Sequence, residues 1–504
     1  MRIKATLAAV FVPLAAMAQE PLSAIDWLTI PPAGGRAGQI LLEPPVTESG
    51  SGPEITVTPL ETLERPIGLV PTHVTGLPVE MWQASAIEDV IRAMNAADVS
   101  RTPAMQTLLY TLLLAETLPP SSSDAAEQFL LARLQRLFDL GAVEPAQAMI
   151  DTAGPDTTPE RFAVWFDATL LSGDETFSCA ALNRSPHLSQ DYAARMFCTL
   201  RKGDWSAAAV MLDAARALNL MPQDELFLLD RFLNPDLYEF APPLPVPSAP
   251  DPLTFRLFEA IGEPLPTAPL PRRFSVADLR DVAGWKAQLE AAERLARTGA
   301  ISPNRLLGVY TDRLPAASGG VWDRVEAIQR FDTALGSRSA DAVAKTLPAA
   351  WNVMRNAGLE VPFSTLFADQ LAGLPLTGEP QRLAFYMRLL SPDYEAAAAD
   401  APDGADMEFL AGLAKGAPSA HGGDTMRQAI FDGFANPPTT PPSLQRYLNN
   451  GRLGEAILQA IKMFHSGRDG NLDDLTAALQ FLRSVGLEDT ARRAAIQSLL
   501  LRAG

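Results

Sequence analysis

The sequence predicts an all-α fold: an α-solenoid of stacked helical hairpins in two halves, with an extended Pro/Gly-rich N-terminal arm. Three observations predict it. From Met81 onward, apolar residues recur with the period of a helix, and we find no alternating segment of strand length. Gly and Pro interrupt the helical segments at short intervals. The chain has 504 residues, 47% of them hydrophobic, which exceeds the size of a single core and indicates several packing units.

Residues 1–18 have the pattern of a cleavable signal peptide. Two basic residues precede an apolar stretch that ends in Ala16-Met17-Ala18, so cleavage is expected before Gln19. The apolar stretch is too short to span a bilayer comfortably, and no Cys follows the cleavage site to carry a lipid. We therefore expect an exported, periplasmic protein without a transmembrane segment after cleavage.

Residues 19–78 are expected to form the extended arm. They contain PPAGGRAGQ and ESGSGPE, in which Gly and Pro prevent regular structure. The segment LSAIDWL near the start of the arm is a small apolar cluster, which either folds back on the body or docks on a partner. Removal of the arm is expected to leave the helical body folded.

Two helical-repeat domains are expected beyond the arm. Residues 79–233 contain amphipathic segments such as AAEQFLLARLQRLFDLG, with apolar residues at i, i+3, i+4 and i+7. Residues 234–274 are rich in Pro and predict a semi-rigid connector with one short helix near LTFRLFEAIG. Helical segments resume over residues 275–504, from DVAGWKAQLEAAERLARTG to DTARRAAIQSLLLRAG.

A Gly followed five residues later by an Ala recurs at four boundaries between helical segments. The Gly supplies the left-handed conformation that ends one helix, and the small Ala lets the next helix pack closely against it. In LRKGDWSAAAVMLDAARAL, Asp204 is then expected to start a helix and Trp205 to pack inside a hairpin. The four pairs are Gly141 and Ala146, Gly203 and Ala208, Gly451 and Ala456, and Gly486 and Ala491.

Gly203, Ala208 and Ala215 match the pattern of the tetratricopeptide repeat, and this segment resembles that family. The other three pairs match less of the pattern, and a strict repeat period is missing, so the resemblance implies irregular tetratricopeptide-like hairpins. More loosely, PLSAIDWL and PAASGGVWDRV are similar to segments of exported helical proteins of alphaproteobacteria. That resemblance implies a compartment and no chemistry.

The two cysteines, Cys179 and Cys198, are expected to form a disulfide. Export places them in an oxidising compartment, and neither a metal-ligand pattern nor a C-x-x-C spacing accompanies them. In the loop-entropy model, a crosslink over this distance stabilises a fold by about 3 kcal/mol.

Charge and motifs argue against several classes of function. The formal net charge of −18 disfavours nucleic acid as a partner. The sequence has no P-loop, G-x-S-x-G elbow, S-x-x-K motif or dinucleotide fingerprint. We therefore expect no catalytic residue, cofactor or metal ion. The four histidines are far apart and lack ligand spacing: His73, His187, His421 and His465.

Three short motifs give weaker indications of chemistry. RDGNLDDL places Asp469, Asn471 and Asp473 at calcium-loop spacing, but it lacks the Gly and Glu of such a loop, so a capped helix start is favoured. Gly319–Gly320 precede a helix and could hold an anion, although a Ser cap and a turn are the simpler interpretation. Glu48–Ser49 match a pair used by periplasmic lytic transglycosylases, and we dismiss the match because no buried helix surrounds it.

The expected function is that of a periplasmic scaffold, adaptor or assembly factor, which binds another protein or a peptide of the cell envelope through the solenoid groove. The alternative is an enzyme acting on cell-wall glycan, or a non-catalytic subunit of one. Two facing carboxylates in a deep cleft would favour the enzyme. A broad groove or an exposed apolar patch would favour the scaffold.

Overall fold

The computed structural model describes residues 65–122, 124–419 and 424–501. The predicted signal peptide, the segment LSAIDWL, Glu48–Ser49 and His421 lie outside the described residues. The described residues belong to one compact unit, Leu63–Gly504.

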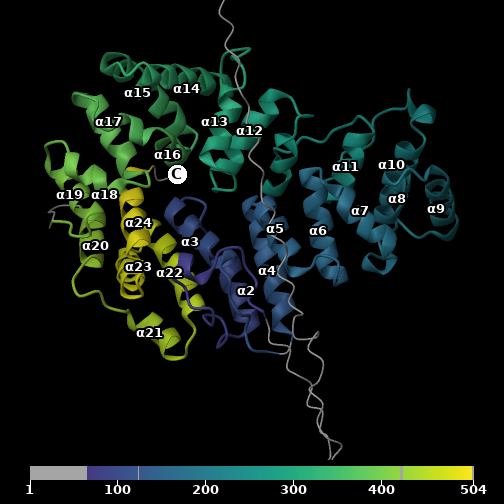
Figure 1. The fold of residues 1–504 in the computed structure, drawn as a ribbon, viewed down its shortest axis with the longest axis horizontal. Helices are drawn as coiled ribbons and strands as arrows, with labels where there is room; N and C mark the ends of the chain where they lie inside the picture. The colour runs from purple at the N-terminus through teal and green to yellow at the C-terminus, as the bar shows by residue number, and fades with distance from the viewer. Residues whose placement is uncertain (1–64, 123, 420–423, 502–504) are drawn as a thin grey trace, which may run out of the picture. The chain divides into compact units, whose positions relative to one another are not determined.

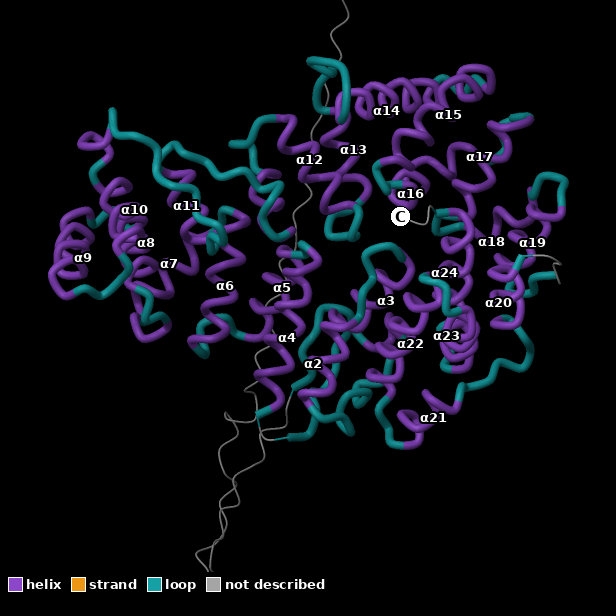
Figure 2. Tube along the Cα trace, turned by 180° about the vertical axis from the view of Figure 1, so that it is seen from behind, coloured by secondary structure: helices purple, strands orange, loops and turns teal. Residues whose placement is uncertain are grey.

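The secondary structure of the described residues is helical and includes no strand (Figure 2). Two isolated β-bridges are present, Ile67 with Thr117 and Val70 with Ala115. The all-α prediction is therefore confirmed for this part of the chain. None of its helices is both long enough and apolar enough to cross a membrane.

Helices that follow one another in sequence also pack on one another along most of the chain (Figure 1). The first group is α1 (Thr72–Thr75), α2 (Ile87–Ala96), α3 (Pro103–Leu114), α4 (Ala125–Leu140), α5 (Val143–Ala153) and α6 (Pro159–Ser172). The second group is α7 (Glu175–Arg184), η2 (Pro186–Leu188), α8 (Tyr192–Arg201), α9 (Trp205–Leu218), α10 (Gln223–Leu233), η3 (Pro235–Tyr238) and α11 (Pro252–Ala260). These packed pairs are compatible with helical repeats, while the solenoid arrangement and the tetratricopeptide resemblance stay predictions.

The remaining helices lead back toward the start of the described chain. The third group is η4 (Arg272–Leu279), α12 (Trp285–Ala296), α13 (Pro303–Thr311), α14 (Val321–Gly336), α15 (Ala340–Asn356), α16 (Glu360–Leu371), α17 (Gly378–Leu389), α18 (Tyr394–Ala397), η5 (Ala398–Asp400) and α19 (Ala405–Ala414). The last group is α20 (Thr425–Gly433), α21 (Pro442–Asn449), α22 (Leu453–Arg468), α23 (Leu472–Ser484) and α24 (Glu488–Leu500).

All four glycine and alanine pairs lie at turns between two helices. The glycines have φ angles from 68° to 91°, a left-handed range that residues with a Cβ rarely adopt. Each partner Ala is buried in the following helix. Gly141 is needed for a second reason, because a Cβ there would lie 2.6 Å from Leu295 Cδ2 on α12. The corner between α4 and α5 therefore packs tightly on a helix distant in sequence.

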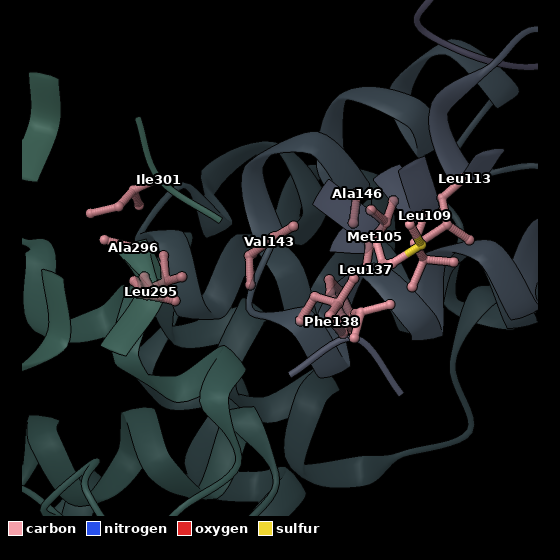
Figure 3. Close-up of a cluster of buried hydrophobic side chains, with 14 of the residues drawn as sticks. Met105, Leu109, Leu113, Leu137, Phe138, Val143, Ala146, Leu295, Ala296 and Ile301 are labelled. Carbon is pink, nitrogen blue, oxygen red and sulfur yellow. The ribbon is translucent and has the colours of Figure 1, made fainter. Parts of the chain in front are cut away.

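The hydrophobic core extends across these groups of helices. Figure 3 shows Leu109 on α3, Phe138 on α4 and Val143 on α5 in one buried cluster, with Leu295 on α12 contributing from the other part of the chain. All four side chains are buried. Burial of each is worth about 1.5–3 kcal/mol relative to exposure, so this seam contributes strongly to the fold.

Residues 65–78, which the sequence analysis places in the arm, pack on the body. The backbone N–H of Leu69 donates to the carbonyl of Leu114 over 2.8 Å. A Cβ at Gly68 would lie 2.4 Å from the backbone of Ala115, so the backbones of these two segments are in direct contact, without side chains between them. Arg133 on α4 is fully buried and holds both segments. It donates to the carbonyls of Leu113, Ala115 and Ile67 over 2.6, 2.8 and 2.8 Å.

The last helices pack against the first ones within Leu63–Gly504. Helix α24 packs on α3, and α22 packs on α2 and α3. The backbone N–H of Ala104 donates to Gln497 Oε1 over 2.7 Å. Gly454 lies against the indole ring of Trp82, where a Cβ would approach the ring to 2.4 Å. The two ends of the helix series thus cover each other, which removes the exposed apolar ends that an open series of repeats must cap.

The Pro-rich residues 234–274 contain η3, α11 and the start of η4. Helix α11 is the short helix that the sequence predicts. Helix α11 packs on α6 and α10, and η4 packs on α4, α6 and α12. The Pro-rich segment therefore packs on helices that precede it in sequence and on α12, which follows it. The boundaries proposed from sequence for two helical domains, 79–233 and 275–504, stay predictions.

Candidate functional site

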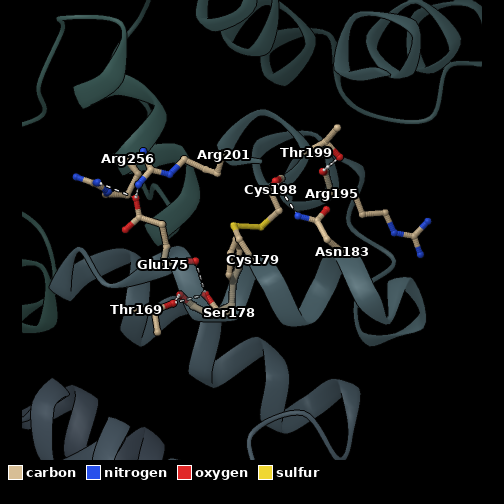
Figure 4. The surroundings of a disulfide bond; sticks show 11 residues. Thr169, Glu175, Ser178, Cys179, Asn183, Arg195, Cys198, Thr199, Arg201 and Arg256 are labelled. Carbon is tan, nitrogen blue, oxygen red and sulfur yellow. Dashed lines mark hydrogen bonds and ion pairs between the residues drawn. A yellow bond between two sulfur atoms is a disulfide. The ribbon is translucent and has the colours of Figure 1, made fainter. Parts of the chain in front are cut away.

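The disulfide fastens two helices near one end of the ribbon, far in sequence from both ends of the described residues. Cys179 on α7 and Cys198 on α8 are bonded and buried, so the predicted disulfide is present (Figure 4). Asn183 Nδ2 donates to the carbonyl of Cys198 over 3.0 Å, which adds a second link between the two helices. The two helices are therefore held in a fixed relative position.

Buried polar contacts also join α7 to α6 and α11. Glu175, at the start of α7, is buried and forms ion pairs with Arg201 on α8 and Arg256 on α11, over 3.2 and 3.3 Å (Figure 4). The buried hydroxyls of Thr169 on α6 and Ser178 on α7 share a hydrogen bond of 2.7 Å. Removing one partner from such a buried network is costly, so this end should be rigid before any ligand arrives.

A pocket of about 790 Å³ opens beside the disulfide, between residues of α5, α6, α7 and α8. Its wall combines the aromatic rings of Trp165 and Phe177 with the cationic side chains of Arg184 and Lys202. Phe177 is 75% exposed. This is the groove of the structure that corresponds best to the predicted binding groove, and we call it the disulfide groove.

Exposed apolar side chains are concentrated next to the disulfide groove. Of the twelve large hydrophobic side chains that are exposed in the described part of the chain, nine lie between residues 177 and 246. We call these nine the apolar tip: Phe177, Trp205, Val210, Leu218, Leu220, Phe227, Leu237, Phe240 and Val246. Five of the nine lie on α7, α9 and α10, which lie together at one end of the ribbon (Figures 1 and 2), and the other four lie on η3 or in the loops after α9 and η3.

Helix α9 explains why the apolar tip is exposed. It packs on α8 and α10 through Ala208, Leu212 and Ala215, which are buried. On the opposite side, Val210 and Leu218 are exposed. A helix that is apolar on both sides normally has neighbours on both sides. Among the described residues, the outer side of α9 has no such neighbour at these two positions.

The expectation for Trp205 is wrong. The sequence analysis placed it inside a hairpin, whereas its side chain is 53% exposed. Trp205 has the spacing of the buried Ala208 and Leu212, but it is the first residue of α9 and lies where that side of the helix is no longer covered. Asp204 behaves as predicted, because its carboxylate accepts the N–H of Ala207 over 3.0 Å and caps α9.

The sequence around the apolar tip is acidic. Residues 204–239 carry seven acidic side chains against two basic ones: Asp204, Asp213, Asp224, Glu225, Asp230, Asp236 and Glu239 against Arg216 and Arg231. Both arginines are already paired within the chain, Arg216 with Asp230 over 2.8 Å and Arg231 with Glu263 over 2.5 Å. The part of the apolar tip on α9, α10 and η3 therefore has a negative rim, whereas Phe177 lies beside the cationic Arg184 and Lys202 of the disulfide groove.

Four carboxylates interact electrostatically behind this rim. Burial raises the pKa of Asp167 to about 7, although the charge of Arg273 opposes the shift. Burial, and next the charge of Asp191, raise the pKa of Glu225 to about 7. Asp191 caps α8 and Asp251 caps α11, through the N–H groups of the following turns. Asp191 and Asp251 therefore act as helix caps.

The weaker motifs take local structural roles. The Asn471 side chain accepts the N–H of Asp474 and caps α23, as the favoured interpretation expected. Asp469 lies 3.3 Å from His465 and 3.8 Å from Arg101. The N–H of Gly319 donates to Asp323 over 2.8 Å and is therefore used within the turn. In the part of the chain that the structure describes, no three His, Cys, Asp or Glu side chains are grouped to hold a metal ion.

The sequence analysis did not identify the apolar tip. Two signals in the sequence point to it. Helix α9 carries Val210, Ala214 and Leu218 where a surface helix normally has charged residues. The Pro-rich segment after α10 carries Leu237 and Phe240, although a solvated linker has little use for large apolar side chains.

Comparisons of the chain with known protein families, with curated proteins and with solved structures found no match.

Proposed function

We propose that this chain is an exported helical scaffold or adaptor, which binds another protein of the cell envelope through the apolar tip. The observation that supports the proposal most is the concentration of nine exposed large hydrophobic side chains at one end. Soluble surfaces that expose groups of apolar side chains usually bind a partner there. The disulfide groove is lined by one of these nine side chains, Phe177.

The partner covers the outer side of α9. Val210, Ala214 and Leu218 lie one turn apart from each other on that side. A helix of the partner laid along them would bury them as α8 and α10 bury the inner side. The partner segment therefore carries apolar residues at helical spacing.

The charge of the rim selects the class of partner. Residues 204–239 have five more acidic than basic side chains, from seven acidic and two basic residues. A second copy of this chain would bring a second acidic rim against the first, which is repulsive. A partner with Lys or Arg residues around an apolar helix is complementary, and its association should weaken as salt is added.

The rigidity of this end favours tight binding. The disulfide joins α7 to α8, and the Glu175 ion pairs join α7 to α8 and α11. A surface that is ordered before binding loses little conformational entropy on association. The disulfide is also compatible with an oxidising compartment outside the cytoplasm, which agrees with the predicted signal peptide.

The alternative, an enzyme acting on cell-wall glycan, has one observation in its favour. Asp167 and Glu225 have pKa values raised to about 7 by burial, the range in which a carboxyl group can act as a general acid. The alternative is weaker because neither side chain lines the disulfide groove. Hydrolysis of isolated cell-wall glycan by the purified chain, lost in Asp167→Asn and Glu225→Gln, would support it.

Site-specific crosslinking in cells tests the binding proposal. A photoreactive amino acid is placed at Val210 or Phe240 of the full chain, and the crosslinked products are identified after irradiation. The matched control position is Leu314, which is 81% exposed and lies outside the apolar tip. We expect one defined partner to be crosslinked from Val210 and Phe240 and not from Leu314.

Surface charge variants complete the test. Val210→Glu combined with Leu218→Glu should remove the crosslinked product formed from Phe240, whereas Leu314→Glu should leave it. All three positions are exposed, so the variants should keep the wild-type melting temperature. A crosslink of equal strength from Leu314, or one that survives the double substitution, would contradict the proposal.

A further inference from the structure

The segment that leads from η3 to α11 has a backbone that its sequence largely determines. Five of its ten residues are prolines, in APPLPVPSAP at 241–250. Every residue from 241 to 247 either is Pro or directly precedes Pro. Proline fixes its φ angle at about −65°, and the residue before it is confined to extended conformations. Both restrictions favour a polyproline II helix, which has three residues per turn. We call residues 241–250 the proline strip.

The exposure of the side chains in the proline strip repeats with the same period. Residues 242–247 form no helix, strand or turn. Every third residue of the strip is half-buried or buried: Ala241, Leu244, Pro247 and Pro250. The two residues in each interval between them are exposed. A β-strand would alternate with a period of two, so the pattern indicates a polyproline II helix that lies with one edge on the body.

A second Pro-rich segment shows that proline content alone does not produce this pattern. Residues 264–267, with the sequence PLPT, alternate between exposed and buried. Their period is two, although half of them are prolines. The period of three therefore distinguishes the proline strip, and the second segment supplies matched control positions.

The inner edge of the proline strip is fixed to the body. The N–H of Leu244 donates to Glu263 Oε2 over 2.8 Å, and Arg231 donates to the carbonyl of Pro242 over 2.8 Å. Arg231 and Glu263 also pair with each other over 2.5 Å. The Leu244 side chain packs on the core. The strip is thus ordered before a partner arrives, so association costs little conformational entropy.

The two outer edges of the proline strip are apolar. Residues three apart share an edge in a polyproline II helix, so Pro242 and Pro245 lie on one outer edge, and Pro243 and Val246 on the other. Val246 is 72% exposed. Phe240, directly before the strip, is 93% exposed. Because proline has no N–H, the backbone of these edges offers mainly carbonyl groups, which accept hydrogen bonds.

We propose that the proline strip docks in a groove of the partner protein that is lined by aromatic side chains. Flat Trp and Tyr rings pack well against the Pro side chains of a preformed polyproline II helix. The Trp N–H and the Tyr hydroxyl can donate to the carbonyl groups of the strip. The partner groove therefore combines aromatic rings with hydrogen-bond donors.

Acidic residues beside the proline strip add a charge requirement. Asp236 and Glu239 precede the strip and are exposed. A Lys or Arg residue next to the aromatic groove complements them. The inference rests on the proposed function, because Phe240 and Val246 belong to the apolar tip. It adds a second contact of different chemistry to the helix that covers α9.

Site-specific crosslinking of the full chain in cells tests the inference. The photoreactive amino acid is placed at Val246 or Ser248, which are exposed and leave every Pro of the strip in place. The control position is Ala268, which is exposed in the second Pro-rich segment. Mass spectrometry then identifies the crosslinked residue of the partner. We expect crosslinks from Val246 and Ser248 to Trp, Tyr or Phe residues of one partner domain, and none from Ala268.

Proline variants of the full chain measure the contribution of the outer edges. Pro242→Ala combined with Pro245→Ala should lower the affinity for the identified partner domain by about tenfold or more, because each change removes two methylene groups from the contact. Both prolines are exposed, so the melting temperature should not change. The control is Pro264→Ala combined with Pro266→Ala, two exposed prolines of the second segment, which should leave the affinity unchanged.

Three results would overturn the inference. The crosslinks from Val246 and Ser248 could fall on residues that are not aromatic, or on a second copy of this chain. The affinity could be the same in the variant of the strip as in the wild type, or fall equally in the control variant. A crosslink could form from Val210 on α9 but from neither Val246 nor Ser248, which would leave the proposed function standing. Absence of all three crosslinks would contradict the proposed function as well.

Discussion

Replacing Arg133 by Met should release residues 67–70 from the body. The Arg133 side chain donates to three backbone carbonyls, of Leu113, Ala115 and Ile67. Each bond from a charged donor contributes about 1.5 kcal/mol or more, and part of that sum is offset because a guanidinium is no longer buried. Burial also lowers the pKa of Arg133 to about 9, because desolvation disfavours the charged form. We expect a net loss of about 3 kcal/mol.

Hydrogen exchange measured by mass spectrometry detects this loss of stability at residues 67–70. The backbone N–H groups of Leu69 and Val70 donate to the carbonyl of Leu114, over 2.8 and 3.0 Å, and should be protected in the wild type. A loss of about 3 kcal/mol raises the population of the open state, and with it the exchange rate, by about 150-fold.

The control for Arg133→Met is Arg92→Met, which removes an exposed arginine paired with Asp89 on the same helix. Such pairs contribute about 0.5 kcal/mol or less, so exchange at residues 67–70 should not change. Wild-type exchange rates at Leu69 and Val70 in Arg133→Met would refute the idea that Arg133 holds this segment. They would also support the expectation that the helical body stays folded when residues 19–78 are removed.

Three further predictions concern the closure, the disulfide and the buried carboxylate. Gly454→Val should lower the melting temperature by several degrees, because its Cβ would lie 2.4 Å from the Trp82 ring. Gly308→Val is the comparison for steric crowding, because Gly308 also lies within a helix, has no positive φ and has no atom within 4 Å of the added Cβ. Cys179→Ser combined with Cys198→Ser should reduce the free energy of unfolding by about 3 kcal/mol, measured by denaturant titration, and a reductant should have no further effect on the variant. Asp167 should make stability fall as the pH rises from about 4 to 7, because the folded chain retains a proton that the unfolded chain has released, with a slope of about 1.4 kcal/mol per pH unit. Denaturant titrations across this range should lose that slope in Asp167→Asn, and an unchanged slope would show that another group is responsible.

Features set by neighbouring residues in sequence could be predicted. The glycine corners, the Asp204 cap and the disulfide all depend on spacings of a few residues or on the compartment. The helical period also follows directly from the order of apolar residues. These signals sufficed for the all-α class and for the helix at residues 252–260.

Contacts between distant segments could not be predicted from a single sequence. Nothing in the residues around Gly454 indicates that its partner is Trp82, and nothing near Ala104 points to Gln497. Arg133 looks like one more charged residue of an amphipathic helix, yet it is buried and holds the segment at Ile67. The closure of the helix series and the end of the arm follow from such contacts.

The candidate site was missed for a different physical reason. A sequence pattern shows that Trp205 belongs to an apolar side of a helix, but it does not show whether another helix covers that side. At α9 no helix among the described residues covers the outer side, so Val210 and Leu218 are exposed, whereas Trp205 is exposed at the first turn of the inner side. The same pattern that predicts a core residue therefore predicts a binding residue where a helix is covered on one side only.

Radical footprinting of the apolar tip in intact cells tests the central claim most directly. Hydroxyl radicals oxidise exposed aromatic side chains, so the oxidation of Trp205, Phe227 and Phe240 is compared between cells and the purified chain. The account predicts strong oxidation in the purified chain and clear protection in cells, with oxidation of the exposed Leu314 equal in both. Equal oxidation of the three aromatic side chains in cells and in the purified chain would contradict it, because no partner would then cover this surface.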